Sequence, residues 1–425
     1  MNIQDIYALY KVNKRISIDS RKTNKGDIYF ALKGEHFNGN HFAADALQKG
    51  ATLCIVDETP PIEDERLIVV DNALITLQTL AAHHRSTLQI PTIAITGSNG
   101  KTTTKELVHA VLITQLKCYT TEGNLNNHIG IPLTILKIED DADIAIVEMG
   151  ANHKREIAGY CTYTKPTHGN ITNCGKAHLE GFGSEAGIIE GKGELFAYLK
   201  ATNGVAFLNN DYDYLKPIAK GMEKIISYGT KDADFVGHCE GENYFLKVSV
   251  HDAPGLQNIR TRLTGNYNLP NVLTAVCIGK TFGITDKNIR LALENYEPKN
   301  SRSQIIKQET NIIIMDAYNA NPSSVKVAIE NLINLKAEKK VVMLGAMLEL
   351  GAYSKVEHQA IVNQLSAYNW DEVLLVGEGF KEAESTYDYV EDSEAAAKWF
   401  RQKAFKDATI LIKGSRGLKM ENILK

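Results

Sequence analysis

The segment TIAITGSNGKTTTKELVHAVL, residues 92–112, places a glycine-rich turn between an apolar run and an amphipathic pattern. The apolar run TIAIT is typical of a buried parallel strand. After the turn, four apolar residues share one helical face: Leu107, Val108, Val111 and Leu112. The segment therefore predicts a strand, a loop and the N-terminus of a helix, which is an arrangement that attracts anions.

The residues of this loop suit a phosphate chain. Gly97 and Gly100 let the backbone approach closely, Lys101 adds a positive charge for the β and γ phosphates, and the Thr102 hydroxyl can ligate Mg²⁺. The spacing departs from the general P-loop G-x-x-x-x-G-K-[ST], because Ile95 occupies the position of its first glycine. Taken alone, the stretch leaves open an ordinary glycine turn with a solvated lysine.

Length and composition restrict the class of protein. A chain of 425 residues exceeds the size at which one hydrophobic core stops growing, so we expect two or three domains. Apolar residues make up 44% and charged residues 23%, as in an average globular protein. The net charge of -4, without a basic block, argues against a nucleic-acid partner.

Targeting signals and cysteines point to a reducing compartment. No apolar run approaches the length of a membrane span, and the N-terminal residues lack the apolar core of a signal peptide, so we expect a cytoplasmic protein without a membrane span. The six cysteines are scattered without a C-x-x-C pair, which argues against a disulfide framework and a zinc site. A catalytic thiol is a minor alternative, because nothing in the sequence singles one out.

Apolar runs alternate with helical patterns along the whole chain, which predicts an α/β protein. The first domain, 1–88, contains DIYFALKG, ATLCIVDE and RLIVVDN as candidate strands. The central domain, 89–298, contains TIAITG, IAIVEMG and HGNITN as buried parallel strands and an alternating stretch, NYFLKVSVHD, that suggests a small antiparallel ribbon. The C-terminal domain, 299–425, repeats the strand pattern four times and is predicted to be Rossmann-like: NIIIMDAYN, KVVMLGAM, EVLLVGEG and ATILIKGSRG.

The loop and a series of further motifs resemble a known family. TGSNGKTTTKE is similar to the ATP loop of the Mur ligases and folylpolyglutamate synthetases, which are ATP-dependent amide ligases. The motifs that favour the Mur ligases span all three domains in order: DSRK at 19–22, NNHIGIP at 126–132, VEMGAN at 147–152, AHLEGFGS at 177–184, KGELF at 192–196, DAYNANPSS at 316–324 and LGAMLELG at 344–351.

The resemblance implies a reaction and its partners. ATP would phosphorylate the terminal carboxylate of UDP-N-acetylmuramoyl-tripeptide, and the amine of D-alanyl-D-alanine would then attack, giving the pentapeptide, ADP and phosphate. The implied cofactors are ATP and Mg²⁺, with two ions expected. We expect a central ATP-binding domain, a UDP-muramoyl-peptide-binding domain at 1–88 and a monomer, although the sequence leaves the oligomeric state open.

Four residues are candidates for the catalytic metal site: Thr102, Glu148, His178 and Lys192. Glu148 ends an apolar run, which predicts that its carboxylate lies at the ligand-binding edge of the sheet; a surface glutamate is the alternative. The family pattern makes His178 a ligand of a second Mg²⁺, although imidazole is an unusual partner for this ion. Lys192 matches a lysine that the family carbamylates with CO₂; an unmodified lysine on phosphate and a solvated helix lysine are the alternatives.

The remaining candidates are assigned to ATP or to the other substrates. With Lys101 and Thr102, the ATP set is Gly97, Ser98, Asn99, Gly100, Thr103, Asn268, Asn271, Arg302, Asp316 and Asn319. Local alternatives are a helix N-cap for Asn268, a surface salt bridge for Arg302 and an Asx cap at the Asp316 turn. The substrate set is Ser20, Arg21, Asn126, Asn127, Lys413, Ser415 and Arg416.

One position departs from the family pattern. Ala346 stands in LGAM where related sequences tend to have aspartate, which puts the contacts to the dipeptide in doubt. We hypothesise that the affinity for the dipeptide is lower in this chain or that Glu349 supplies the missing carboxylate.

Three rival functions are weaker. A ligase that adds a single diamino acid is disfavoured because the chain lacks a DNPR stretch, and folate polyglutamylation because that family lacks the DSR domain and DAYNANP. A P-loop switch or motor would hydrolyse ATP without an acceptor.

Overall fold

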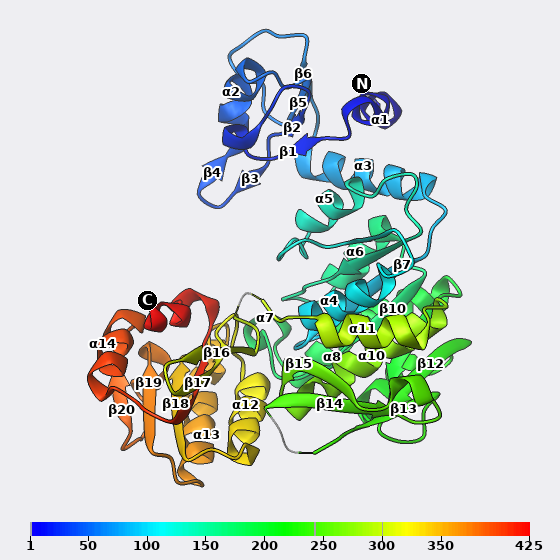
Figure 1. Cartoon of the computed structure of the whole chain (residues 1–425). Coiled ribbons are helices and arrows are strands. Elements are labelled where there is room, and N and C mark those ends of the chain that lie inside the picture. Colours follow the sequence, from blue (N-terminus) through cyan, green and yellow to red (C-terminus); the bar gives the residue numbers. More distant parts are fainter. Residues whose placement is uncertain (1, 242–243, 300) are drawn as a thin grey trace. The chain divides into compact units, whose positions relative to one another are not determined.

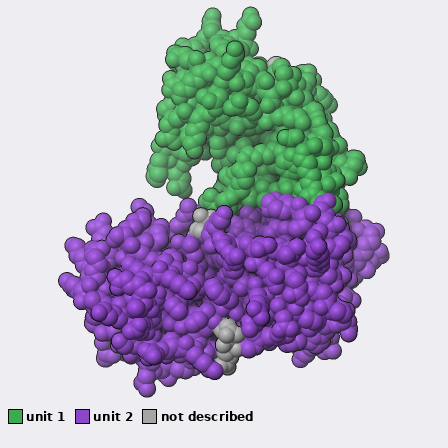
Figure 2. Space-filling model, viewed as in Figure 1, with its two compact units in different colours: residues 1–94, 116–151, 155–169 green, residues 95–115, 152–154, 170–425 purple. Residues whose placement is uncertain are grey.

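The computed structural model describes residues 2–241, 244–299 and 301–425 (Figure 1). These residues form two compact units (Figure 2). The first unit comprises residues up to 94, 116–151 and 155–169, and the second comprises residues 95–115, 152–154 and 170–425. No helix in the described part of the chain is long and apolar enough to cross a membrane.

The N-terminal sheet has four parallel strands in the order β1-β2-β5-β6. Their bounds are Ile16–Ser17, Ile28–Phe30, Leu53–Val56 and Leu67–Val69. The three predicted strands are confirmed as β2, β5 and β6, whereas the two-residue β1 and the short β3–β4 hairpin (Lys33–Gly34 and Phe37–Asn38) were not predicted. The helices of this part are α1 (Ile3–Asn13), α2 (Ala43–Gln48) and α3 (Ala73–Thr87).

A nine-stranded sheet follows, in the order β15-β14-β13-β12-β11-β10-β7-β9-β8. Strands β7 to β11 are Thr92–Thr96, Cys118–Thr120, Ile144–Glu148, His168–Ile171 and Val205–Asn209. Strands β12 to β15 are Lys224–Gly229, Phe235–Cys239, Phe245–Val250 and Ile259–Thr264. The predicted ribbon is confirmed, because β14 pairs antiparallel with both β13 and β15.

The helices between these strands complete the α/β pattern. They are α4 (Lys101–Leu112), α5 (Gly130–Leu136), α6 (Glu156–Thr164), α7 (Leu179–Phe182), α8 (Glu185–Ala201), α9 (Lys216–Ala219), α10 (Leu269–Thr281) and α11 (Asp286–Asn295). Helix α10 packs against α4, and its first residues therefore lie close to the glycine-rich loop.

The C-terminal sheet has six strands in the order β16-β17-β21-β18-β19-β20. The bounds of β16 to β21 are Gln304–Gln308, Asn311–Asp316, Lys339–Gly345, Glu372–Val376, Asp388–Val390 and Ala408–Lys413. All four predicted strands are confirmed and are parallel, and β16 is an antiparallel edge strand. Three helices flank this sheet: α12 (Pro322–Asn334), α13 (Ser354–Ser366) and α14 (Ser393–Lys403).

The two faces of the C-terminal sheet are both buried, which explains its continuous apolar runs. Alternate residues such as Ile313, Met343 and Ile412 pack with Ala396 of α14 and with Met420 near the chain end. Because side chains alternate along a strand, the residues between them face the opposite side. The α/β prediction is therefore confirmed for this domain.

Candidate active site

The glycine-rich loop joins the end of β7 to the start of α4, as the sequence predicts. Gly97 has φ 143° and Gly100 has φ 79°, which are conformations that favour glycine. A Cβ atom at Gly97 would lie 2.0 Å from Oγ1 of Thr172, and one at Gly100 would lie 2.7 Å from Oδ1 of Asn271. Both glycines are therefore required by backbone angle and by space.

The strand-end segment 172–175 holds the loop in shape. The Ser98 amide donates to the carbonyl of Asn173 at 2.9 Å, and the Ser98 hydroxyl donates to the carbonyl of Gly175 at 2.6 Å. The Asn99 amide donates to Oδ1 of Asn173 at 3.1 Å. These bonds fix the loop before any ligand arrives, which favours tight binding at low entropic cost.

The Lys101 ammonium lies over the loop. Its Nζ atom donates to the carbonyl of Gly97 at 2.6 Å and to that of Ser98 at 3.2 Å. The side chain is thus held by the loop, which contradicts the alternative of a solvated lysine. A positive charge at a helix N-terminus favours an anion there.

A chain of buried amides links α4 to the start of α10. The Thr104 hydroxyl donates to Oδ1 of Asn271 at 3.0 Å, Nδ2 of Asn271 donates to Oδ1 of Asn268 at 2.8 Å, and Nδ2 of Asn268 donates to the carbonyl of Thr264 at 2.8 Å. Asn268 occupies the N-cap position of α10, but its side chain makes no capping hydrogen bond. The structure thus places both predicted asparagines directly behind the loop.

On α4, Thr102 is buried and Thr103 is half-buried.

His178 and Lys192 lie on either side of the short helix α7. His178 is the N-cap residue of α7 with φ 53°, and its Nδ1 atom lies 2.6 Å from Oε2 of Glu349. The contact with His178 lowers the pKa of Glu349, and the charge of Lys101 adds to this effect. Glu349 therefore interacts with the His178 ring and with the positive charge of Lys101.

Lys192 is a buried lysine in the middle of α8. It is 1% exposed, and its Nζ atom lies 4.8 Å from the centre of the Phe182 ring. Burial raises the pKa of the neighbouring Cys174 to about 12, an effect that the Lys192 charge opposes. The alternative of a solvated helix lysine is wrong, and a thiol with so high a pKa is a poor nucleophile.

Glu148 ends β9 in the first unit and is 1% exposed, so the alternative of a surface glutamate is wrong. Its Oε1 atom accepts a hydrogen bond from Nδ2 of Asn126 at 2.7 Å. Asn127 has a local role, because its Oδ1 atom accepts from the amides of Ile129 and Gly130 at the start of α5. Two predicted residues, Glu148 and Asn126, are therefore hydrogen-bonded to each other, whereas the Asn127 side chain caps the N-terminus of α5.

The DSRK motif forms a compact turn in the N-terminal domain. Ser20 is buried, and its carbonyl accepts from Nζ of Lys49 at 2.7 Å. The exposed guanidinium of Arg21 contacts both carboxylate oxygens of Asp19 at 2.9 Å and lowers the pKa of Asp19 to about 2. The guanidinium is therefore oriented at the surface by its neighbour.

The C-terminal domain brings Asp316 and Lys413 together at the ends of β17 and β21. Nζ of Lys413 lies 2.6 Å from Oδ2 of Asp316 and donates to the carbonyl of Asn319 at 3.2 Å. The Lys413 side chain is 2% exposed and that of Asp316 is 18% exposed. The helix cap at this turn is Asn321, whose side chain accepts from the Ser324 amide, so the predicted Asx cap belongs to Asn321 and not to Asp316.

Arg302 and Arg416 share one aromatic ring. The Arg302 guanidinium lies 3.4 Å from the centre of the Tyr318 ring, and that of Arg416 lies 5.1 Å from it. Nη1 of Arg416 also donates to the Tyr318 hydroxyl at 3.1 Å. Cation–π stacking, and not the salt bridge considered from the sequence, holds Arg302. Ser415 is buried, and its hydroxyl accepts from the Leu348 amide at 3.0 Å.

The C-terminal domain contacts the glycine-rich loop directly. Nδ2 of Asn321 donates to Oδ1 of Asn99 at 2.7 Å. Nearby, the Lys176 amide donates to the Ser323 hydroxyl at 2.8 Å, and Nζ of Lys176 lies 2.8 Å from Oε1 of Glu357. Sequence reasoning missed Lys176 and Glu357, and the only signal was that Asn321 and Ser323 belong to the DAYNANPSS motif.

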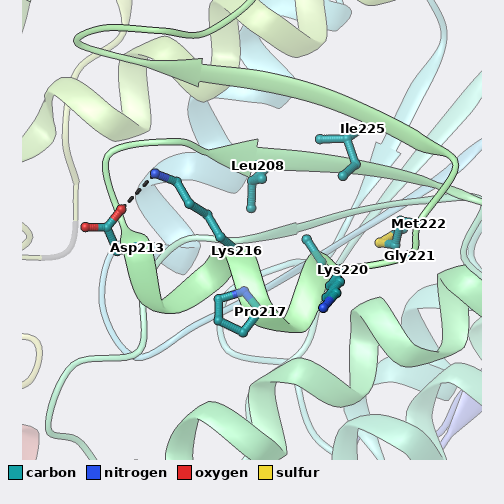
Figure 3. A pocket seen from close by; sticks show the side chains of 9 residues that line it. Leu208, Asp213, Lys216, Pro217, Lys220, Gly221, Met222 and Ile225 are labelled. Carbon is teal, nitrogen blue, oxygen red and sulfur yellow. Dashed lines mark hydrogen bonds and ion pairs between the residues drawn. The ribbon is translucent and has the colours of Figure 1, made fainter.

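A separate groove lies beside β11, β12 and α9 (Figure 3). Leu208, Pro217 and Ile225 contribute apolar surface, and two further lining residues, Lys216 and Asp213, form an ion pair at 2.7 Å. None of its lining residues is a candidate from the sequence, so this groove is not the predicted nucleotide site.

Some of the candidate metal ligands are oxygen donors. Mg²⁺ keeps several waters and uses one or two carboxylates together with substrate phosphates. A buried carboxylate at Glu148 and a hydroxyl at Thr102, the second residue of α4, are oxygen donors of this kind. Among the described residues there is no group of three or more histidine, cysteine, aspartate or glutamate side chains that could hold a metal ion. Glu148 belongs to the first unit and Thr102 to the second, and each, taken by itself, is an oxygen donor of the type that a hard cation prefers.

The fold and this loop define an α/β protein that binds a nucleotide phosphate chain at the end of a parallel strand. Comparison with protein families is more specific. The Mur ligase family catalytic domain matches residues 14–87, the Mur ligase middle domain matches 95–279, and the Mur ligase glutamate ligase domain matches 301–416. The chain belongs to the Mur ligase family.

Individual relatives agree with this assignment. The chain is 34% identical to the UDP-N-acetylmuramoyl-tripeptide–D-alanyl-D-alanine ligase of Bacillus subtilis and 33% identical to that of Escherichia coli, and each alignment covers 96% of this chain and 92% of the relative. MurF from Acinetobacter baumannii has a TM-score of 0.88 at 30% identity, over 97% of this chain and 92% of that chain. MurF ligase from Thermotoga maritima in complex with ADP has a TM-score of 0.88 at 27% identity, over 97% and 96% of the two chains.

Proposed function

We propose that the chain joins D-alanyl-D-alanine to UDP-N-acetylmuramoyl-tripeptide at the expense of ATP, giving UDP-N-acetylmuramoyl-pentapeptide, ADP and phosphate. The observation that carries the proposal is the glycine-rich loop, which holds Lys101 over its carbonyls and directs a helix N-terminus toward a phosphate chain. Relatives that cover almost the whole chain bear the name of this activity. An ATP-dependent reaction also suits the cytoplasmic location expected from the sequence.

The reaction has two balanced steps. A carboxylate oxygen of the tripeptide attacks the γ phosphorus of ATP, and ADP leaves, so that an acyl phosphate forms. The amine of D-alanyl-D-alanine then attacks the acyl carbon, phosphate leaves with the oxygen it gained, and the nitrogen loses a proton. Both steps bring anions together, so the site must supply positive charge and exclude water.

The residues of the chain divide this work. Lys101 and the first amides of α4 neutralise the β and γ phosphates, and Asn268 and Asn271 support the loop from behind. When bound, Mg²⁺ withdraws charge from the phosphate oxygens. Thr102 and Glu148 would hold it, with His178 as ligand of a second ion. Arg302 would reach phosphate and Asp316 the ribose once ATP is bound.

The burial of Lys192 supports the proposal that its side chain carries a carbamate. An ammonium in a fully buried position carries a large desolvation cost, and CO₂ would convert it into a carboxylate-like group of the kind that divalent cations prefer. A ¹³C-bicarbonate NMR spectrum tests this directly: a carbamate signal is expected from the native chain and not from Lys192→Ala.

The remaining candidates are assigned by chemistry. Ser20 and Arg21 would grip the UDP diphosphate, since a hydroxyl and a guanidinium suit a pyrophosphate. Asn126 would line the muramoyl-peptide channel beside Glu148. The acyl phosphate and the dipeptide would be contacted by residues at the end of β21 or just after it: Lys413, Ser415 and Arg416.

One phosphate-release assay tests the function. UDP-muramoyl dipeptide and tripeptide are each offered a single amino acid or D-alanyl-D-alanine, and phosphate is expected only for tripeptide with D-alanyl-D-alanine. Release with the dipeptide and a diamino acid would instead identify the single-residue ligase. Rapid phosphate release without any acceptor would identify a P-loop ATPase and refute the proposal.

A further inference from the structure

Glu349 lies in the loop after β18 and reaches from the C-terminal domain to His178. Its Oε2 atom lies 2.6 Å from Nδ1 of His178, and the His178 side chain is 19% exposed. Both residues have positive φ, 62° for Glu349 and 53° for His178. Non-glycine residues adopt this conformation at a cost, so two of them facing each other indicate a contact that the surrounding structure enforces.

The backbone around this contact is also fastened. The amide of Glu180 faces the carbonyl of Glu349 at 3.5 Å, and the Tyr353 hydroxyl donates to the carbonyl of Gly183 at 3.2 Å. A Cβ atom at Gly351 would lie 3.2 Å from Cβ of Glu180. The loop 349–353 therefore packs closely on the turn 178–183.

The chemistry of a metal-binding imidazole explains the pairing. A histidine that ligates a metal through one ring nitrogen almost always donates its other N–H to a carboxylate, a carbonyl or water, which fixes the tautomer and the ring orientation. Nδ1 lies 2.6 Å from the Glu349 carboxylate without the alignment of a hydrogen bond. A proton on Nδ1 that pairs with this carboxylate would leave the lone pair on Nε2.

We propose that Glu349 is a positioning residue for His178, supplied by the C-terminal domain, and that it orients the imidazole so that Nε2 can bind a divalent cation. This inference rests on the role given to His178 under the proposed function. It differs from the sequence hypothesis, in which Glu349 holds the dipeptide. The two hypotheses predict changes in different ligands, Mn²⁺ or Mg²⁺ in one case and D-alanyl-D-alanine in the other.

The test measures Mn²⁺ binding by electron paramagnetic resonance, with the full chain and saturating ADP, and does not require ligase activity. Glu349→Ala is expected to weaken Mn²⁺ binding about 10-fold or more, which is the usual cost of losing such a carboxylate. Glu349→Gln keeps an acceptor for the Nδ1 proton and should lose less. The double variant with His178→Ala should bind no more weakly than His178→Ala alone.

Glu357→Gln is the matched control. Glu357 is another carboxylate of the C-terminal domain that contacts the 174–184 segment, but its partner is Lys176 and not His178. Its Mn²⁺ affinity should stay within about twofold of the native value. Circular dichroism on each variant shows whether the fold is kept, and Glu349→Gln tests the inference if Glu349→Ala does not fold.

Three results would overturn the inference. Unchanged Mn²⁺ affinity in both Glu349 variants, with a raised KM for D-alanyl-D-alanine, would support the dipeptide role. An equal loss in Glu357→Gln would show that any weakening of the domain contact has the same effect. Unchanged Mn²⁺ affinity in His178→Ala would remove the metal role on which the inference rests, and the phosphate-release assay would judge the ligase function separately.

Discussion

The buried ion pair between Lys413 and Asp316 gives a prediction whose size follows from the structure. Lys413→Met removes the ammonium and leaves the Asp316 carboxylate, which is 18% exposed, with a hydrogen bond from the Ser303 amide at 3.1 Å. Breaking one side of a buried pair costs about 3 to 5 kcal/mol, because the remaining charge is uncompensated. We take the lower value, about 3 kcal/mol, since Asp316 keeps some contact with solvent.

Tryptophan fluorescence isolates this effect. The chain has 2 tryptophans, and both, Trp370 and Trp399, belong to the C-terminal domain, so a urea titration followed by tryptophan emission reports on that domain. With a slope of about 2 kcal/mol per molar urea, the unfolding midpoint should fall by about 1.5 M. Lys355→Met is the control, because its pair with Glu382 is a surface contact at 3.7 Å, worth about 0 to 1 kcal/mol.

A double-mutant cycle decides whether the pair itself is responsible. If Lys413 and Asp316 stabilise each other, Lys413→Met combined with Asp316→Asn should cost at least about 2 kcal/mol less than the sum of the single changes. Additive costs, or a midpoint shift no larger than that of Lys355→Met, would show that Lys413 is not stabilised by this contact. The pair would then have to be explained by ligand binding alone.

Three further predictions concern the loop and a buried histidine. Gly97→Ala should weaken ADP binding about 100-fold or more by calorimetry, because the new methyl group would meet the Thr172 hydroxyl at 2.0 Å; near-native affinity would contradict the loop geometry. Lys101→Ala should lower the rate of product formation about 10²- to 10³-fold with an unchanged circular dichroism spectrum. Burial lowers the pKa of His358, whose Nε2 accepts from the Met347 amide at 3.0 Å. The unfolded chain therefore binds the proton more readily, so the free energy of unfolding should fall as pH drops below about 6.5, and less steeply in His358→Gln. Equal pH slopes in urea titrations would refute this.

In the C-terminal sheet, the strands that were predicted correctly are those buried on both faces. Continuous apolar runs identified all four inner strands of the C-terminal sheet, because parallel strands covered by helices need such runs. The missed strands, β16 and β20, lie at the two edges of that sheet, where half-exposed positions interrupt the apolar pattern. Helix α11 was also not predicted. It buries only Ile289 and Leu293, and most of its other residues are polar or charged, so its apolar pattern in the sequence is short.

The loop was predictable for a different reason. Its chemistry is local, since the glycines, the lysine and the helix start follow one another in the chain, and the structure shows the same arrangement. The contacts of the C-terminal domain with the 174–184 segment were not predictable. They join residues far apart in sequence, such as Lys176 and Glu357, and depend on how two sheets pack within the second unit.

The departure at Ala346 shows why a neighbouring carboxylate cannot simply replace a missing one. Ala346 is 2% exposed, its amide donates to the Val376 carbonyl at 2.8 Å, and its Cβ lies close to Gly377 and Gly379. An aspartate there would extend into this crowded, buried space, whereas Glu349 is half exposed after the following turn and contacts His178. Because the two side chains have different neighbours, a carboxylate at one position does not reproduce the contacts of the other. The dipeptide is therefore expected to rely on groups other than Glu349, and the carboxylate at 349 is left to orient the imidazole.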